Sequence, residues 1–322
     1  PGMAGSSVDD LLPGDRQRRR ALQGLVGTVM GLLASPRVRL FIGAMLISLS
    51  PVWVRLVAVS PSTSGFYRVL IGGAALVIYL VFTRRKLELT SRGWWLVLVA
   101  SVFLALDLWF WHRSIHIIGP GLSTLLANFQ VFIMMALGIV FLRQVPKPAQ
   151  LVAVPLAVLG LALIVGFDWG ELPADFRLGV IYGLLTAVVY AGYLFSLRQL
   201  RSESTYRIPT REMAVISMLC AVLMAVTVLG EGGSLAIPTA TDLGWLLGYG
   251  VLSHCIGWLF IASSLSEVTA VEAGLALLLQ PTLSFVWDVL FFARPMTVLE
   301  LVGASITLVA IYLGSRPVSK QT

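Results

Sequence analysis

The sequence predicts an all-α, polytopic membrane protein with ten transmembrane helices, arranged as two inverted five-helix repeats. Three observations support this fold class. First, 57% of the 322 residues are hydrophobic and only 12% are charged, whereas a soluble domain carries about 25% charged residues. Second, ten apolar runs of spanning length follow residue 37. Third, two long stretches, about 150 residues apart, share one hydropathy pattern.

The repeated stretches are residues 109–163 and 259–313. Each contains the end of one apolar run, a small-residue turn, a long apolar run, a break and a further apolar run. Aligned without a gap, they pair Phe110 with Phe260, Ser114 with Ser264, Gln130 with Gln280, Phe141 with Phe291 and Leu151 with Leu301. Few residues are identical, so the comparison depends mainly on the hydropathy pattern. A repeat of this size in a membrane protein is typical of a transporter.

The ten spans follow from the lengths of the apolar runs, because a helix needs about 20 residues to cross a bilayer. We expect them at residues 38–58, 64–83, 93–112, 119–142, 148–167, 177–198, 211–230, 241–263, 268–292 and 297–315. The apolar run at residues 21–34 is too short to cross and has basic flanks, so we expect an interfacial helix there.

The predicted organisation has four parts. They are an N-terminal tail with the interfacial helix (1–37), a first repeat (38–170), a second repeat (177–316) and a C-terminal tail (317–322).

The basic residues indicate the orientation of the spans. Lys and Arg gather in the N-terminal tail and in alternate connections, such as 84–92, 143–147 and 198–211, while the opposite connections are neutral or acidic. By the positive-inside rule, both termini lie in the cytoplasm. With five spans in each half, the second repeat starts on the other side of the membrane and is therefore inverted. The net charge of +7 thus reflects topology, and we expect no nucleic-acid partner.

Three places in the chain resemble a known family. The second span begins with residues 62–73, STSGFYRVLIGG, an aromatic-Arg stretch. The fourth and ninth spans are each followed by a short break and a Gly-containing final span. In these features the chain resembles the drug/metabolite transporter superfamily, whose repeat is called EamA. Asn128–Gln130 in the fourth span is most similar to the amino-acid exporters, including the aromatic amino acid exporter group of bacterial inner membranes.

The chain also departs from the family pattern. The family usually has Pro in the middle of the fourth and ninth spans. Here Pro281 follows Gln280, but Val131 follows Gln130. The family often ends the same spans with Glu, and this chain has Arg143-Gln144 and Ala293-Arg294 at those positions.

The resemblance implies ten helices around a central cavity and a function in export. We expect a secondary transporter in a bacterial inner membrane that exports amino acids, chiefly aromatic and other apolar ones, and related metabolites by alternating access. An exporter of purines, sugars or amphipathic cations is the alternative. A membrane-embedded enzyme is a weaker alternative, because the chain has none of the common catalytic motifs. We expect a small-molecule substrate, contact with lipid and no cofactor or metal, in a monomer or else a dimer.

Ionisable residues inside spans are the strongest site candidates, because they normally face a cavity or a partner. Asp107 in the third span shares a helix face with Trp111 at i+4 and Ser114 at i+7. This face could bind a substrate amine or carry a proton. The structural alternative is an ion pair between Asp107 and either Arg68 or Arg113.

His254 and Trp258 form a similar i, i+4 pair in the eighth span. The histidine could titrate near neutral pH, or it could be a neutral residue hydrogen-bonded within the bundle. Arg68 in the second span could attract a substrate carboxylate, or serve as the partner of Asp107.

Amides and aromatics complete the predicted substrate-binding set. Asn128 and Gln280 suit uncharged or zwitterionic groups, although amides also join helices. Tyr190 in the sixth span could stack on an apolar substrate, or simply pack. We expect the first, third, fourth, sixth, eighth and ninth spans to line the cavity. Cys220 and Cys255 are not spaced as metal ligands, so we expect them to be small core residues.

Overall fold

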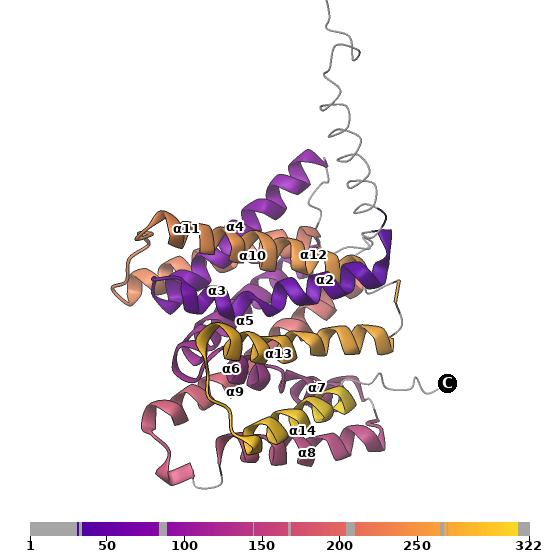
Figure 1. Cartoon of the computed structure of the whole chain (residues 1–322). Helices are drawn as coiled ribbons and strands as arrows, with labels where there is room; N and C mark the ends of the chain where they lie inside the picture. Colours follow the sequence, from indigo (N-terminus) through magenta and orange to yellow (C-terminus); the bar gives the residue numbers. More distant parts are fainter. Residues whose placement is uncertain are drawn as a thin grey trace, which may run out of the picture.

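The computed structural model describes residues 31, 34–83, 89–143, 145–166, 169–203, 210–264, 267, 268 and 270–314. These residues fold into helices joined by short connections, without a strand among them (Figure 1). Eight helical stretches in this part of the chain are long and apolar enough to cross a membrane. Two shorter apolar helices follow, at Ala276–Phe292 and Val298–Gly314. The predicted polytopic all-α fold is confirmed.

The helices of each half follow the predicted spans closely. The first half contains α2 (Pro36–Ser48), α3 (Ser50–Leu56), α4 (Pro61–Phe82), α5 (Ser91–Ile118), α6 (Pro120–Ala127), α7 (Gln130–Leu142) and α8 (Pro148–Val165). After a 3-10 turn, η2 (Trp169–Glu171), the second half contains α9 (Ala174–Glu203), α10 (Thr210–Gly230), α11 (Ala240–Leu247), η3 (Gly248–Gly257), α12 (Trp258–Ser264), α13 (Ala270–Phe292) and α14 (Val298–Gly314). The predicted interfacial helix at 21–34 falls outside the described residues, apart from Gly31 and Ala34.

One predicted connection was wrong. We expected the third span to end at residue 112 and the fourth to begin at residue 119, but α5 continues through Ile118. Gly119 alone separates α5 from α6, with φ 86° and ψ 164°, a region of backbone space open essentially only to glycine. Pro120 then starts α6, where a missing N–H costs no helix hydrogen bond. A single glycine thus makes the reversal that we assigned to residues 113–118.

Three spans are interrupted where they pass the centre of the bundle. The first breaks at Leu49, between α2 and α3. The fourth breaks at Asn128 and Phe129, where the backbone N–H groups bond to carbonyls three residues back. The eighth contains η3, a π-helical segment; such segments are frequent at functional sites. Discontinuous helices near the midplane are a common feature of transporter binding sites.

The packing of the helices reflects the inverted repeat. The second span packs against the seventh (α4 on α10), the fifth against the tenth (α8 on α14), and the fourth against the ninth (α6 on α13). The α5–α9 pair has its equivalent in the packing of α2 against η3 and α12. Arg143 and Ala293, at repeat-equivalent positions after α7 and α13, both have a left-handed backbone with φ 49°.

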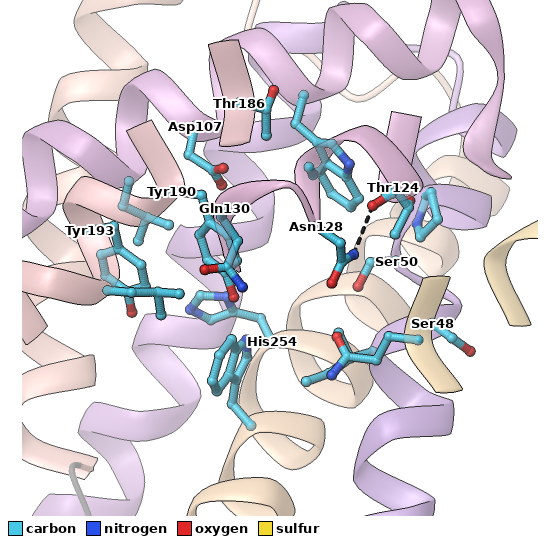
Figure 2. A pocket seen from close by; sticks show the side chains of 18 of the residues that line it. Ser48, Ser50, Asp107, Thr124, Asn128, Gln130, Thr186, Tyr190, Tyr193 and His254 are labelled. Carbon is cyan, nitrogen blue, oxygen red and sulfur yellow. Dashed lines mark hydrogen bonds between the residues drawn. The ribbon is translucent and has the colours of Figure 1, made fainter. Parts of the chain in front are cut away.

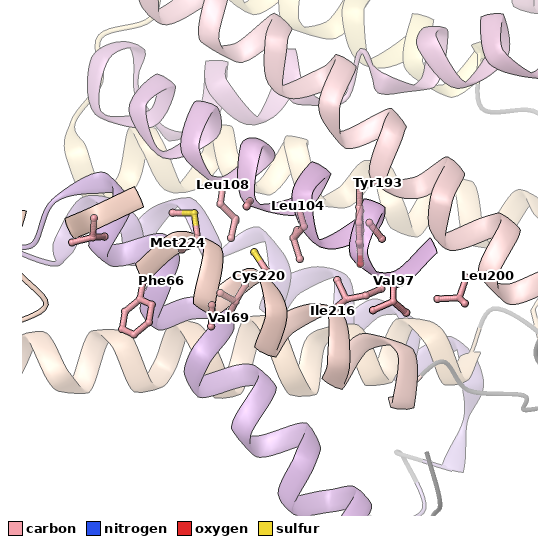
Figure 3. Close-up of a cluster of buried hydrophobic side chains, with 14 residues drawn as sticks. Phe66, Val69, Val97, Leu104, Leu108, Tyr193, Leu200, Ile216, Cys220 and Met224 are labelled. Atoms are coloured by element: carbon pink, nitrogen blue, oxygen red, sulfur yellow. The ribbon is translucent and has the colours of Figure 1, made fainter. Parts of the chain in front are cut away.

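The largest cluster of buried apolar side chains joins α4, α5, α9 and α10 (Figure 3). Leu108 and Met224 are fully buried in it. Cys220 belongs to the same cluster, and both cysteines are free and buried. Large apolar side chains such as Phe82 and Leu290 are exposed on the outside of the bundle, as expected for helices that face lipid. The core therefore holds the two halves together around the interrupted spans.

Candidate functional site

A cavity of about 290 Å³ lies between the helices of the two halves (Figure 2). This volume is just below the range of about 300–1,000 Å³ that is usual for small-molecule sites. All eight residues that the sequence singled out line this cavity: Arg68, Asp107, Trp111, Asn128, Tyr190, His254, Trp258 and Gln280. The six spans that we expected contribute to the wall, and the second and seventh spans also do, through Arg68, Met213 and Ser217.

Asp107 is a buried carboxylate in the third span. Its exposed fraction is 8%, and no hydrogen bond or ion pair joins it to another described residue. The structural alternative, an ion pair with Arg68 or Arg113, was wrong: Arg113 pairs with Glu231, 2.6 Å away. Because a buried charge is costly without compensation, this carboxylate is available for a group that enters the cavity.

Arg68 binds neutral groups of the protein. Its Nε donates to His254 Nδ1 at 3.4 Å, and its Nη1 donates to the Tyr249 hydroxyl at 3.0 Å. The guanidinium carbon lies 5.4 Å from the ring centre of Trp111, within the range of a cation–π interaction. No carboxylate among the described residues forms an ion pair with Arg68. The cavity thus contains a cation and an anion that do not pair with each other.

His254 is hydrogen-bonded through both ring nitrogens. Since arginine has no acceptor, Nδ1 of His254 accepts from Arg68. The other nitrogen, Nε2, then carries the proton and donates to Ser217 Oγ at 2.8 Å. This arrangement corresponds to the structural alternative of a neutral histidine held within the bundle, while the ring still lines the cavity.

A second histidine extends this network, and the sequence reasoning missed it. His112 Nδ1 donates to the Leu108 carbonyl at 2.7 Å, so its Nε2 accepts from the Tyr249 hydroxyl at 3.1 Å. His112 and Tyr249 are both fully buried. The available signal was that His112 is a third polar residue within the third span, beside Asp107. A chain of hydrogen bonds therefore runs from Arg68 through Tyr249 to His112.

Aromatic side chains form much of the remaining wall. The rings of Tyr190 and Tyr193 are stacked, with centres 6.1 Å apart and an interplanar angle of 17°. Trp111 and Trp258 line the cavity from the third and eighth spans. These rings provide flat apolar surfaces beside the charged groups.

The amides lie on the interrupted fourth span and the proline-containing ninth span. Asn128 Nδ2 donates to the Thr124 carbonyl at 2.8 Å, which fixes the amide at the break (Figure 2). Gln130 and its repeat equivalent Gln280 both line the cavity, and neither amide bonds to another described residue. Pro281 cannot donate to the Leu277 carbonyl, and Leu277 is itself part of the cavity wall.

A polar cluster joins helices at the end of the bundle opposite the start of α2 and the end of α14, here called the distal end. Glu231 forms the ion pair with Arg113 and accepts from Trp109 Nε1 at 2.7 Å and from Ser62 Oγ at 2.8 Å. Burial opposes ionisation, but the hydrogen bonds from Trp109 and Ser62 and the charge of Arg113 lower the pKa of the Glu231 carboxyl below its usual value. This cluster connects α4, α5 and the loop after α10.

A second ion pair connects helices at the distal end. Arg294 lies 3.6 Å from Asp288, and the Asp288 carboxylate accepts from the Gly121 backbone N–H at 2.9 Å. The side chain of Glu272, the other acid of the ninth span, lies outside the described part of the chain.

The order of the spans, the packing of equivalent helices across the bundle and the central cavity are those of a two-repeat membrane protein. A model of the EamA-like transporter family matches residues 38–166 and again residues 177–316. The chain belongs to the EamA-like transporter family. It is therefore a multi-pass membrane transporter of the drug/metabolite transporter superfamily, and its family is one of transporters with small-molecule substrates.

The fold of this EamA-like transporter has been seen before. A solved structure described as "Crystal structure of protein" is similar, with a TM-score of 0.61 and 14% identity. The match covers 87% of this chain and 96% of the other, so it supports the fold over nearly the whole length. No curated protein matches the sequence.

Proposed function

We propose that this transporter exports amino acids, foremost those with aromatic or other apolar side chains, and related metabolites. The observation that carries the proposal is the placement of Asp107 and Arg68 in one cavity without an ion pair between them. An amino acid is a zwitterion, so its ammonium group can bind the Asp107 carboxylate while its carboxylate binds the Arg68 guanidinium. Both interactions are charge-assisted, which makes them strong and directional.

The aromatic wall supports the apolar part of the substrate. Tyr190, Tyr193, Trp111 and Trp258 surround the charged groups, and such rings bind apolar and aromatic side chains through area burial and stacking. The proposed substrate-binding residues are Arg68, Asp107, Trp111, Asn128, Tyr190, His254, Trp258 and Gln280. No nucleic-acid partner is proposed, and the transporter is proposed to act as a monomer.

Alternating access is the proposed mechanism. The cluster around Glu231 and the Asp288–Arg294 pair join helices at the distal end, so release of substrate on that side requires these contacts to open. We propose that the distal end faces away from the cytoplasm, because the connections at the other end carry most of the basic residues. Both termini would then be cytoplasmic, in a bacterial inner membrane.

The two repeat units are proposed to extend over residues 38–170 and 177–316. The N-terminal tail, 1–37, and the C-terminal tail, 317–322, lie outside them. Inverted repeats of this kind rock against each other around a central site, and the cavity between the halves is the site expected for such a movement.

Transport by the purified protein tests the proposal. Proteoliposomes loaded with a panel of labelled amino acids should release them in a saturable manner, with and without a proton gradient, and empty liposomes provide the background. We expect release to be fastest for amino acids with aromatic and large apolar side chains. Failure of every amino acid in the panel to be released above background would refute the amino-acid assignment.

An amphipathic cation is the second candidate substrate. Asp107 among aromatic rings also suits a cationic group, through charge and cation–π contacts. The role of Arg68 discriminates between the two candidates, because a substrate without a carboxylate has no need of this guanidinium. Competition of amino-acid transport by an amino acid and by its methyl ester separates them: only the zwitterion should compete if Arg68 binds a carboxylate.

A further inference from the structure

The serine and threonine hydroxyls in the cavity wall fall into two groups. Most are satisfied within the protein: Ser48 bonds to Met45 O, Thr186 to Tyr182 O, Ser284 to Gln280 O, and Ser217 to His254. The hydroxyls of Ser50 and Thr124 have no partner among the described residues. A hydroxyl inside a helix usually bonds to a carbonyl one turn back, so these two depart from the pattern of their neighbours.

A third unpartnered group lies in the same wall. The indole Nε1–H of Trp111 has no acceptor among the described residues. Ser50 and Trp111 are 1% and 8% exposed, so water outside the protein does not satisfy them. A buried polar atom without a partner is destabilising, and three such atoms in one wall indicate a ligand or ordered water that completes their hydrogen bonds.

Asn128 adds an acceptor to these groups. Its Nδ2 is held by the Thr124 carbonyl, and its Oδ1 accepts from no described residue. In the view of Figure 2, Ser50, Thr124 and Asn128 are drawn to one side of Asp107, Tyr190, Tyr193 and His254, and a hydrogen bond joins Asn128 to Thr124. All of these groups are uncharged. The Trp111 Nε1–H is a donor and Asn128 Oδ1 is an acceptor, while the hydroxyls of Ser50 and Thr124 can each donate or accept a hydrogen bond.

We propose that Ser50, Trp111, Thr124 and Asn128 form a neutral subsite that binds an uncharged hydrogen-bonding group on the substrate side chain. This proposal rests on the proposed function and refines it. Trp111 lies one helical turn from Asp107 on the same face, so an amino acid whose ammonium group binds Asp107 can direct its side chain toward the subsite. Among aromatic amino acids of similar size, the transporter therefore prefers those with a hydroxyl on the ring.

Matched substrate pairs test the subsite in proteoliposomes containing the full chain. Tyrosine against phenylalanine, and 5-hydroxytryptophan against tryptophan, differ only in one hydroxyl group on the aromatic ring. We expect kcat/KM to favour the polar member of each pair by about tenfold, because a site with unpaired polar groups discriminates against an analogue that leaves them unpaired. A ratio near one in the wild-type protein would overturn the proposal.

Two variants link the preference to the subsite. Thr124→Val keeps the shape of the side chain and removes its hydroxyl, and Ser50→Ala does the same in a second helix. Each should reduce the polar-to-apolar ratio severalfold, and retained thermal unfolding behaviour shows that the variant is folded. Thr227→Val is the matched control, because Thr227 bonds to Leu223 O within α10 and is not part of the cavity wall; its ratio should equal that of the wild type.

The outcomes distinguish a failure of the neutral subsite from a failure of the proposed amino-acid function. If amino acids are transported but neither subsite variant changes the ratio, the neutral subsite is refuted and the amino-acid function stands. If the wild-type protein transports none of the four amino acids, the proposed function fails, and the subsite assignment fails with it.

Discussion

The Arg68 guanidinium donates a hydrogen bond to the Tyr249 hydroxyl across 3.0 Å, although the unpaired carboxylate of Asp107 lines the same cavity. The arginine is therefore positioned by neutral groups and keeps its full charge for a substrate. Tyr249 in turn donates to His112, which fixes the direction of the hydroxyl. Arg68 is held in place without being neutralised.

Tyr249→Phe should weaken substrate binding by about tenfold. The change removes one acceptor of Arg68, and a hydrogen bond to a charged group contributes about 1.5–3 kcal/mol, where 1.4 kcal/mol corresponds to a factor of ten. We expect an increase in KM that exceeds the change in kcat, measured by release from proteoliposomes. Tyr67→Phe is the control, because the Tyr67 hydroxyl bonds to the Leu235 carbonyl at the distal end. Equal KM values for the Tyr249 variant and wild type would contradict the positioning role.

Asp107→Asn should abolish efflux or reduce it at least about tenfold, while expression holds. The substitution keeps the size of the side chain and removes the charge that we assign to the substrate ammonium group, a charge-assisted contact of about 1.5–3 kcal/mol. Transport of a labelled amino acid by equal amounts of purified protein measures the effect. Asp175→Asn changes an exposed acid at the start of α9 and should transport normally. Wild-type transport by the Asp107 variant would remove this residue from the site.

The sequence located the spans because the lengths of apolar runs are dictated by the bilayer. It also found much of the cavity wall, since a polar residue such as Asp107 or Gln280 in a lipid-facing segment must turn toward a cavity or a partner. The partners themselves could not be predicted. Arg113 forms its ion pair with Glu231, more than 100 positions away in the chain. This pairing depends on how α5 packs beside the loop after α10.

Local backbone geometry was the second feature that could not be predicted from the sequence. Pro51 lies at the interruption in the first span, yet the break at Asn128 has no proline, and the π-helical segment η3 has no sequence signature. Tyr249 was missed for a similar reason. An aromatic residue in an apolar run is taken for a core side chain unless the buried polar groups around it are known. Tertiary contacts decide these features.

Gly119→Ala should destabilise the transporter by about 1–3 kcal/mol, the usual cost of a side chain in a glycine-only backbone region. Gly119 has φ 86° and ψ 164°. A Cβ atom there would also lie 2.8 Å from Asp288 Oδ2, which disturbs the Asp288–Gly121 contact. Thermal unfolding in detergent should show a lower Tm. Gly244→Ala is the control, since its helical backbone has open space around it and alanine favours a helix; an equal Tm change in both variants would contradict the prediction.

Glu231→Gln should lower Tm slightly at neutral pH, and the difference from the wild type should disappear in acid. The folded-state pKa of Glu231 is lowered, so the carboxylate contributes stability above its unfolded pKa of about 4.3, and this contribution is lost as the pH falls through the folded pKa. The effect is small because partly exposed ion pairs contribute at most about 1 kcal/mol. Unfolding curves of both proteins should be parallel between about pH 5 and pH 8 and converge below about pH 4. Glu171→Gln, at an exposed acid in η2 without an ion pair among the described residues, should follow the wild type throughout. A Tm difference that grows as the pH falls would show that Glu231 is held in its protonated form, and the distal cluster would then not depend on its charge.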